Sequence, residues 1–300
     1  MQVSTKLFNE QAIAQFNKQS AEIQDIQSKI ATGKNILNAS DDPTAAANLS
    51  FAKEQMSAIE KYKSNIQHAN TRMTMAENAL DDVATVLTRI YELAIQGRND
   101  SYTVQDRVSI AVEIAQLKET LVGLSNAKDH KNDFLFSGFK VTTAPFEKKF
   151  DGGVTYKGDR GVHSVQISET MKMKTSMDGG SVFLRIKTEA GRQSVFDVVS
   201  KIETDLKAGF VDEASIGEMN AAIDHIAVQR SMAGAQINKG EIQLSAIERR
   251  IVLMKEKVSG MEDADLSKLV TELQSKMTSR DAAQQSFVKI GQQSLFDFIR

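Results

Sequence analysis

The 300-residue chain contains no cysteine, no tryptophan and only two prolines. Without cysteine it can form neither a disulfide nor any metal or nucleophile site that depends on a thiolate. The scarcity of proline, which breaks a helix when it lies in the helix interior, favours long uninterrupted helices. The chain is long enough to bury a substantial core and to form two or three substructures.

Long hydrophobic runs are also missing. No stretch of about 18 consecutive apolar residues occurs, so the sequence predicts no membrane-spanning helix. The N-terminal segment "MQVSTKLFNEQAIAQFNKQS" has no continuous apolar core of the kind found in secretory signal peptides. A protein of this sequence that leaves the cell is therefore expected to use another route.

Charge of a single sign is not in excess, because 37 Lys and Arg residues nearly balance 39 Asp and Glu residues. Nucleic-acid binders and proteins of charged membrane surfaces normally show such an excess. We therefore expect neither nucleic acid nor membrane as a partner, and we expect the partners to be other proteins.

The chemistry-bearing side chains form no recognisable constellation. The four histidines, His68, His130, His163 and His225, are dispersed, and the sequence has no zinc-protease, nucleophile-elbow, P-loop or dinucleotide-binding motif. Asp41 and Asp42 have no third metal ligand nearby. The sequence therefore predicts no enzyme, with no catalytic, cofactor-binding or metal-binding residue.

The first helix is predicted from Thr5, a possible N-cap, to Gly33, a glycine in the position that commonly ends a helix. The segment 31–47, "ATGKNILNASDDPTAAA", then interrupts the helical pattern with a polar bend. Asp42 suits an N-cap and Pro43 the first position of a new helix, so the bend closes one helix and opens another.

The next helix carries a continuous heptad pattern, and Gly97 is predicted to end it. Between Ala52 and Ala94 it would extend roughly 65 Å at 1.5 Å per residue. Thr103 is predicted to cap the helix that follows. The heptad positions are Ile59, Tyr62, Ile66, Ala69, Met73, Ala76, Leu80, Val83, Leu87, Ile90 and Ala94, and the stripe of the following helix is Ile110, Ile114, Leu117, Leu121 and Leu124.

Residues 134–192 change in character, with short alternating runs separated by glycines, such as "VTYKG", "VHSVQIS", "MKMKTSM" and "SVFLRIK". This pattern predicts a small antiparallel β-rich insert. Helical patterns return with a possible capping box at Ser194 and Asp197 and a stop at Gly209.

Another long helix is predicted from about Asp212 to Val258, and near Gly260 its apolar stripe shifts register. The acidic "EDAD" at 262–265 is interpreted as the N-terminal cap and first turn of a last helix. The stripe before the shift is Leu244, Ile247, Ile251, Met254, Val258 and Met261, and the stripe after it is Leu266, Leu269, Val270, Leu273 and Met277.

The predicted fold is mainly α with a β-rich insert: a long antiparallel helical rod, or coiled coil, formed by both halves of the chain, plus a small antiparallel β domain. We expect a terminal coiled-coil domain at 1–42 and 262–300, a helical rod domain at 43–133 and 193–261, and an outer β-rich domain at 134–192.

The terminal helices can bury only part of their apolar stripes against each other, so we expect them to complete their packing against other chains. The residues of this assembly interface and of the inter-domain bend are predicted from the patterns above. The interface set is Phe8, Ile13, Phe16, Ile23, Ile26, Ile30, Leu266, Leu269, Leu273, Met277, Phe287, Leu295, Phe296 and Phe298, and the bend set is Gly33, Asn35, Asn38, Asp41, Asp42 and Pro43.

Two segments resemble the flagellin superfamily. The bend "ATGKNILNASDDPTAAA" resembles a stretch near the N-termini of flagellins, and "SGMEDADLSKLVTEL", residues 259–273, resembles their C-terminal segment. Within that superfamily, the start "MQVSTKLFNEQAIAQFNKQ", the segment "FLFSGFKVTTAPF" and the ending "QQSLFDFI" resemble the hook-associated protein 3 family, whose members join hook and filament.

The resemblance implies a structural adaptor of the bacterial flagellum that polymerises through its terminal helices into a ring of subunits. It also implies flagellin, a hook-side junction protein and an export chaperone as partners, and type III export to the extracellular flagellum without a cleaved signal. The bend would contact neighbouring subunits through Asn35, Asn38, Asp41 and Asp42. A flagellin that forms the filament itself, and a cytosolic coiled-coil scaffold, remain as alternatives.

Overall fold

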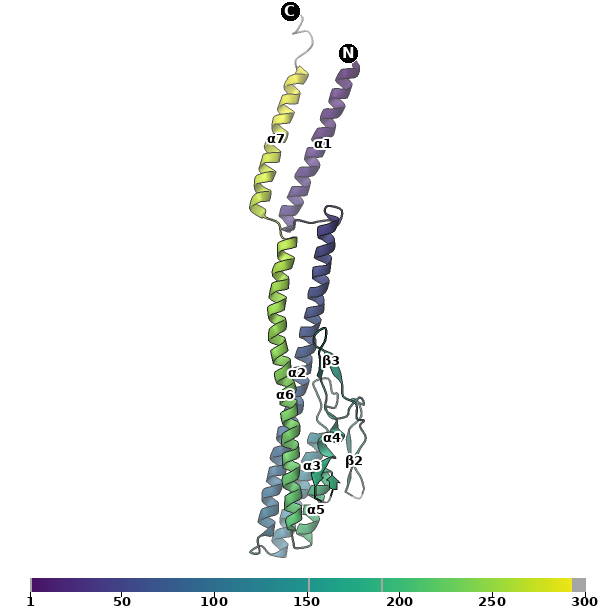
Figure 1. The fold of residues 1–300 in the computed structure, drawn as a ribbon, viewed down its shortest axis with the longest axis vertical. Coiled ribbons are helices and arrows are strands. Elements are labelled where there is room, and N and C mark those ends of the chain that lie inside the picture. The colour runs from purple at the N-terminus through teal and green to yellow at the C-terminus, as the bar shows by residue number, and fades with distance from the viewer. Residues whose placement is uncertain (1, 151, 190, 293–300) are drawn as a thin grey trace, which may run out of the picture. The chain divides into compact units, whose positions relative to one another are not determined.

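The structure is a computed structural model that describes residues 2–150, 152–189 and 191–292. It divides into two compact units, which we call the terminal unit (Met1–Ala58 with Ile251–Arg300) and the central unit (Ile59–Arg250). The helices, labelled in Figure 1, are α1 (Gln2–Thr32), α2 (Pro43–Arg98), α3 (Val104–Ser125), α4 (Gly179–Phe183), α5 (Val195–Lys207), α6 (Glu213–Glu262) and α7 (Leu266–Gln292).

The predicted end of the first helix is confirmed, whereas its predicted start is wrong. Gly33 follows α1 with φ +69°, and its N–H donates to the carbonyl of Lys29 at 2.9 Å, which closes the last turn. Glycine adopts this left-handed conformation without steric cost. The helix begins at Gln2, so Thr5 lies inside it and cannot be its N-cap. No proline or glycine precedes Thr5 to stop the helix from extending to this point.

Asp42 caps α2 as predicted. Its Oδ1 accepts the N–H groups of Thr44 and Ala45 at 3.0 and 2.9 Å, and Pro43 occupies the first helical position. The heptad positions of α2 are buried in the central unit, except that Tyr62 is half-buried.

Gly97 does not end α2, contrary to the prediction, because the helix continues to Arg98. Gly97 is buried, and a Cβ atom at this position would lie 2.2 Å from Cδ2 of Leu206 in α5. The glycine therefore serves close packing of α5 against α2 rather than helix termination.

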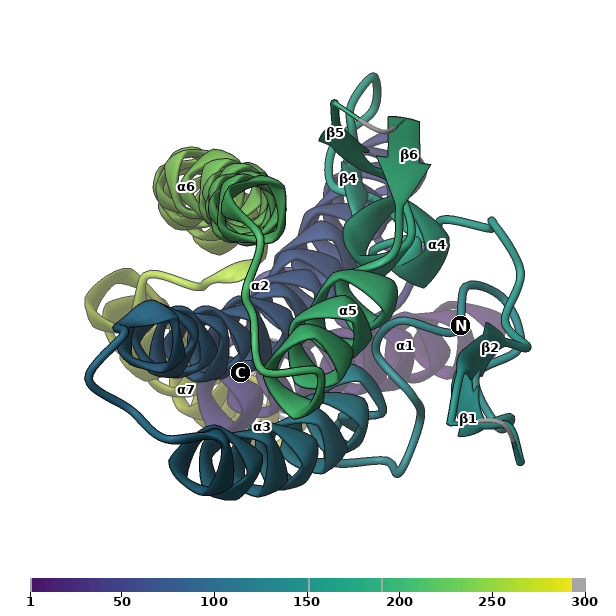
Figure 2. The same ribbon diagram turned by 90° about the horizontal axis from the view of Figure 1, so that it is seen from below.

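The predicted caps of α3 and α5 are confirmed, because Thr103 forms a complete capping box with Asp106 and the Ser194 hydroxyl accepts the N–H of Asp197 at 3.0 Å. The predicted capping box of α5 is formed only in this half, since the Asp197 side chain has no hydrogen bond to the backbone of Ser194 in the described structure. Gly209 follows α5 with φ +87°, as expected for a helix stop. The two helices lie side by side in the central unit, as Figure 2 shows.

In the central unit α6 runs antiparallel to α2. Ion pairs join them at 3.0 Å for Lys63 and Glu248, 2.8 Å for Arg230 and Glu77, and 3.1 Å for Arg98 and Glu213. This pairing of helices from the two halves of the chain confirms the predicted architecture (Figure 1).

The acidic stretch 262–265 serves two helices, whereas the prediction assigned it to the last one alone. Glu262 is the last residue of α6, which extends four residues beyond Val258. Asp265 does cap α7, since its Oδ1 accepts the N–H of Lys268 at 3.1 Å.

The β insert is antiparallel as predicted, but it consists of three separate two-stranded ladders. The run "SVFLRIK" is not one strand. Its first residues belong to the short helix α4, which Asp178 caps, and only the last residues of the run enter β5. The ladders are β1 (Phe146–Lys148) with β2 (Val154–Tyr156), β3 (Ser164–Gln166) with β4 (Lys172–Lys174), and β5 (Ile186–Thr188) with β6 (Gly191–Gln193).

Aromatic side chains provide the core of the insert. The ring of Phe183 lies 5.3 Å from Phe136 and 5.2 Å from Phe146, and Phe146 lies 5.3 Å from Phe196 of α5. All four side chains are almost completely buried. This cluster anchors the insert to α5, since strands of three residues cannot bury a core of their own.

Candidate assembly surface

The paired helices α1 and α7 of the terminal unit carry most of the predicted interface residues. The ring of Phe287 in α7 lies 5.8 Å from the rings of both Phe8 and Phe16 in α1. Further along, Lys276 forms an ion pair with Glu22 at 2.6 Å. These contacts give the two helices an antiparallel arrangement, which can be followed in Figure 1.

One part of the predicted interface set packs inside the chain. Ile23 and Ile26 are only 4% and 6% exposed, because α7 covers them. The half-buried members lie along the same line of contact, and they are Phe16, Ile30, Leu269, Leu273 and Phe287. These residues hold α1 and α7 together within one chain.

The other part of the set remains exposed. Ile13 is 56% exposed, Leu266 48% and Met277 38%, and Phe8 is 43% exposed although its ring touches Phe287. Leu295, Phe296 and Phe298 lie outside the described residues. The exposed residues are available to a second chain, and their role in assembly stays a prediction.

The polar residues of the bend make local hydrogen bonds. The N–H of Asn38 donates to Oδ2 of Asp41 at 2.9 Å, and the N–H of Asp41 donates back to the carbonyl of Asn38 at 3.1 Å. Asp42 caps α2, and the N–H of Asn35 donates to the carbonyl of Glu262 at 2.8 Å. Asn35, Asn38, Asp41 and Asp42 are nevertheless exposed, and their contact with a neighbouring subunit stays a prediction.

Glu262 was not predicted as a site residue, yet it joins the bend to both long helices. Its carboxylate, 12% exposed, forms ion pairs with Lys34 at 2.6 Å and Lys53 at 2.8 Å. Hydrogen bonds from the two lysines hold the pKa of Glu262 below its usual range, and Glu262 in turn raises the pKa of Lys34. A carboxylate in the last turn of a helix interacts unfavourably with the negative end of the helix dipole. A glutamate at this position in the sequence therefore indicates that cations lie close to it.

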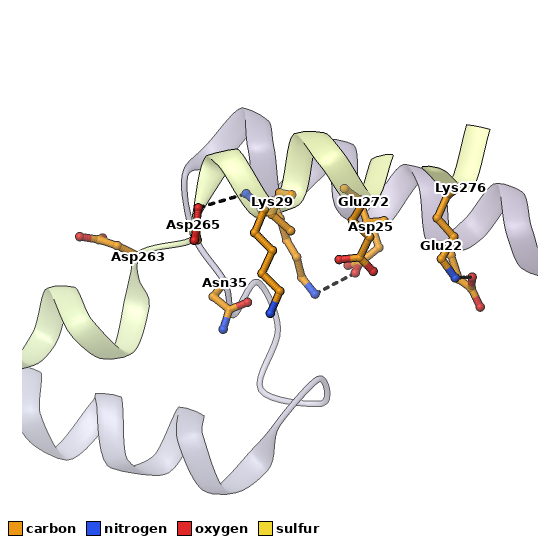
Figure 3. A pocket seen from close by; sticks show the side chains of 11 residues that line it. Glu22, Asp25, Lys29, Asn35, Asp263, Asp265, Glu272 and Lys276 are labelled. Atoms are coloured by element: carbon orange, nitrogen blue, oxygen red, sulfur yellow. Dashed lines mark hydrogen bonds and ion pairs between the residues drawn. The ribbon is translucent and has the colours of Figure 1, made fainter. Parts of the chain in front are cut away.

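A charged cleft of about 450 Å³ lies between α1 and α7, shown in Figure 3. Five carboxylates and three lysines line it, and the ion pair with Lys276 lowers the pKa of Glu22. Within the described part of the chain, no three His, Asp or Glu side chains are grouped as a metal site would require. The described helices also include none that is long and apolar enough to span a membrane.

Comparisons with known proteins give consistent matches. Residues 3–141 match the bacterial flagellin N-terminal helical region. The chain is 22% identical over 321 residues to flagellar hook-associated protein 3 of Salmonella typhimurium, with 100% of both chains covered. It is 24% identical over 246 residues to the flagellar filament 33 kDa core protein of Treponema phagedenis, covering 82% of this chain and 80% of that one.

A solved structure shows the same fold. The crystal structure of flagellar hook-associated protein 3 from Legionella pneumophila superposes with a TM-score of 0.65 at 18% identity, covering 71% of this chain and 98% of that chain. The chain is thus similar to the bacterial flagellin N-terminal helical region over residues 3–141 and to a hook-associated protein 3 from end to end, and it shares the fold of this solved structure.

Proposed function

We propose that this protein is a structural adaptor of the bacterial flagellum that forms the junction between hook and filament. The end-to-end similarity to a hook-associated protein 3 carries this proposal, because it includes the two terminal helices as well as the middle of the chain. The apolar residues that α1 and α7 leave exposed support polymerisation through those helices.

The adaptor performs no reaction and needs no cofactor. Its assembly is driven by burial of apolar surface between chains. We propose a ring of identical subunits between flagellin and a hook-side junction protein, delivered by a flagellar export chaperone. The subunits reach the extracellular flagellum by type III export, and neither nucleic acid nor membrane takes part.

The proposed domains follow the helix ends and differ from the two compact units. Residues 1–42 and 262–300 form the assembly domain, 43–133 and 193–261 the helical rod, and 134–192 the outer β-rich domain. The compact units divide instead within α2 and α6, after Ala58 and after Arg250. The proposal rests on the breaks at the bend and at 263–265, where helices end and begin.

A deletion strain tests the proposed function. We expect cells that lack this protein to keep their hooks, lose their filaments and shed flagellin into the medium, while the full-length gene restores attached filaments. Filaments that remain attached without the protein would contradict the adaptor function. Antibody labelling of isolated appendages should give one band at the base of each filament.

A filament subunit is the second candidate, favoured by the similarity to the Treponema phagedenis core protein. The two functions differ in copy number and position. Labelling along the whole appendage, together with long filaments formed by the purified chain alone, would support the filament subunit and contradict the junction protein.

A further inference from the structure

The α1–α7 pair has two unlike sides, and the charged cleft identifies one of them. Glu22, Asp25 and Lys29 of α1 face Lys268, Glu272 and Lys276 of α7 across this cleft. Figure 3 labels five of these residues beside the cleft, namely Glu22, Asp25, Lys29, Glu272 and Lys276. We call this the charged side.

On α1 the residues of the opposite flank carry no charge. They are spaced three and four apart, so they fall within roughly a quarter of the helix circumference at 3.6 residues per turn. All are exposed in the single chain. They are Asn9, Ile13, Asn17, Ser20, Gln24 and Gln27.

On α7 the corresponding flank is mainly apolar. Positions 266, 270, 277 and 288 fall within about 40° of each other at 3.6 residues per turn, which makes a second stripe beside the one that packs on α1. Leu266, Val270 and Val288 are about half exposed, at 48%, 50% and 53%. The whole flank consists of Leu266, Val270, Gln274, Met277, Asp281, Gln284 and Val288.

Because α1 and α7 run antiparallel, these two flanks lie on the same side of the pair, which we call the low-charge side. Charged residues on this side are Asp281, which lies within the α7 flank and pairs with Arg280 at 3.1 Å, together with Lys6 and Glu10 near the start of α1. Exposed surfaces are normally rich in charge, whereas the cores of protein interfaces are depleted of it.

We propose that the low-charge side is the surface that packs against a second copy of this chain, while the charged side is left in contact with water. This inference rests on the proposed function, and it places the contact between subunits on one side of the helix pair. A face with few charges can be buried against a different surface of a neighbouring identical chain with little repulsion and few unpaired buried ions. Burial of the charged side would require removing eight ionic groups from water.

The absence of cysteine makes the test direct, since each introduced cysteine is the only one in the chain. Gln24→Cys and Val270→Cys place a thiol on the low-charge side. Lys18→Cys and Ser275→Cys are the matched controls on the exposed charged side. The charge of Lys18 helps to lower the pKa of Glu22, and Ser275 is next to Lys276. Each full-length variant is expressed in the deletion strain, and its maleimide labelling is compared between purified monomer and isolated appendages.

We expect all four thiols to react in the monomer. In appendages, we expect at least tenfold slower labelling at Gln24→Cys and Val270→Cys, with unchanged labelling at the two control positions. A reagent that links a cysteine to a nearby amine should join Gln24→Cys or Val270→Cys chains to other copies of this chain, seen as dimers on a gel.

Equal labelling on both sides, or protection confined to the charged side, would overturn the inference while leaving the adaptor function intact. Cross-links only to a different protein would also overturn it, because the occupant would not be a second copy. Absence of the chain from appendages would instead overturn the proposed function itself.

Discussion

Asn70 of α2 fills the space that a side chain at position 240 of α6 would need. A Cβ atom at Gly240 would lie 2.0 Å from Oδ1 of Asn70, and that oxygen is buried without a hydrogen-bond partner in the described structure. The two residues meet where the long helices of the central unit pack together. A polar residue within such a seam can select one register of two helices over its neighbours.

Gly240→Ala should therefore fail to stabilise the central unit, although alanine favours helices more than glycine does. The added methyl group forces the Asn70 amide to move, and overpacking of this kind costs roughly 1–3 kcal/mol. Gly234→Ala is the matched control in the same helix, because nothing lies within 4 Å of its Cβ position. The control should gain about 0.5–1 kcal/mol in the free energy of unfolding, measured by urea titration.

The double variant Asn70→Ala with Gly240→Ala checks the cause. Removal of the amide should restore the stabilisation, so that the two substitutions are strongly non-additive. Additive effects would show that Asn70 does not limit the approach of the helices.

Leu80→Asp should unfold the central unit. Leu80 is fully buried in the heptad seam of α2, and an unpaired carboxylate there would be destabilising by more than about 4 kcal/mol. Circular dichroism should show loss of helix and of cooperative melting. Asp82→Leu, at an exposed position of the same helix, should leave the melting transition in place.

Ile26→Asp should separate α1 from α7 and leave the central unit folded. The 6% exposure of Ile26 means that the single chain already buries this side chain, so the variant should lose roughly 2–4 kcal/mol of local stability. Hydrogen exchange should show faster exchange in residues 12–30 and 269–287 alone. Gln24→Asp, exposed on the same helix, is the control and should keep slow exchange.

Acidification should release the bend before it unfolds the rest of the chain. The lysine partners depress the pKa of Glu262, so its ionised form stabilises the folded state at neutral pH. That contribution is complete above the ordinary glutamate pKa of about 4.3 and is lost as pH falls through the lower folded-state pKa. Proteolysis within residues 33–42 should accelerate over this range.

Glu262→Gln should show the same acceleration at neutral pH, several-fold over the unaltered protein, and should lose the pH dependence. Glu256→Gln, at an exposed position in α6, should behave like the unaltered protein. Equal cleavage rates in the Glu262 and Glu256 variants would show that the ion pairs with Lys34 and Lys53 do not hold the bend.

Local chemistry in the sequence determined where most helices begin and end, and which residues of α2 face the core. Asp42 with Pro43, Thr103, Ser194 and Gly209 act through backbone groups only a few residues away, so a short stretch of sequence contains the whole cause. The heptad seam was equally readable, because its spacing repeats over many turns.

The burial of the apolar residues on each helix depends on the tertiary structure. So do the roles of single glycines in close packing and of single acidic residues in ion pairs. Leu269 and Leu266 both lie on the single apolar stripe predicted for α7, but contact with α1 half-buries the first and leaves the second exposed. Gly97 and Glu262 gain their roles from Leu206 and Lys53, which lie far away in the sequence. Such contacts depend on how distant helices pack, and the spacing of residues along one helix does not contain that information.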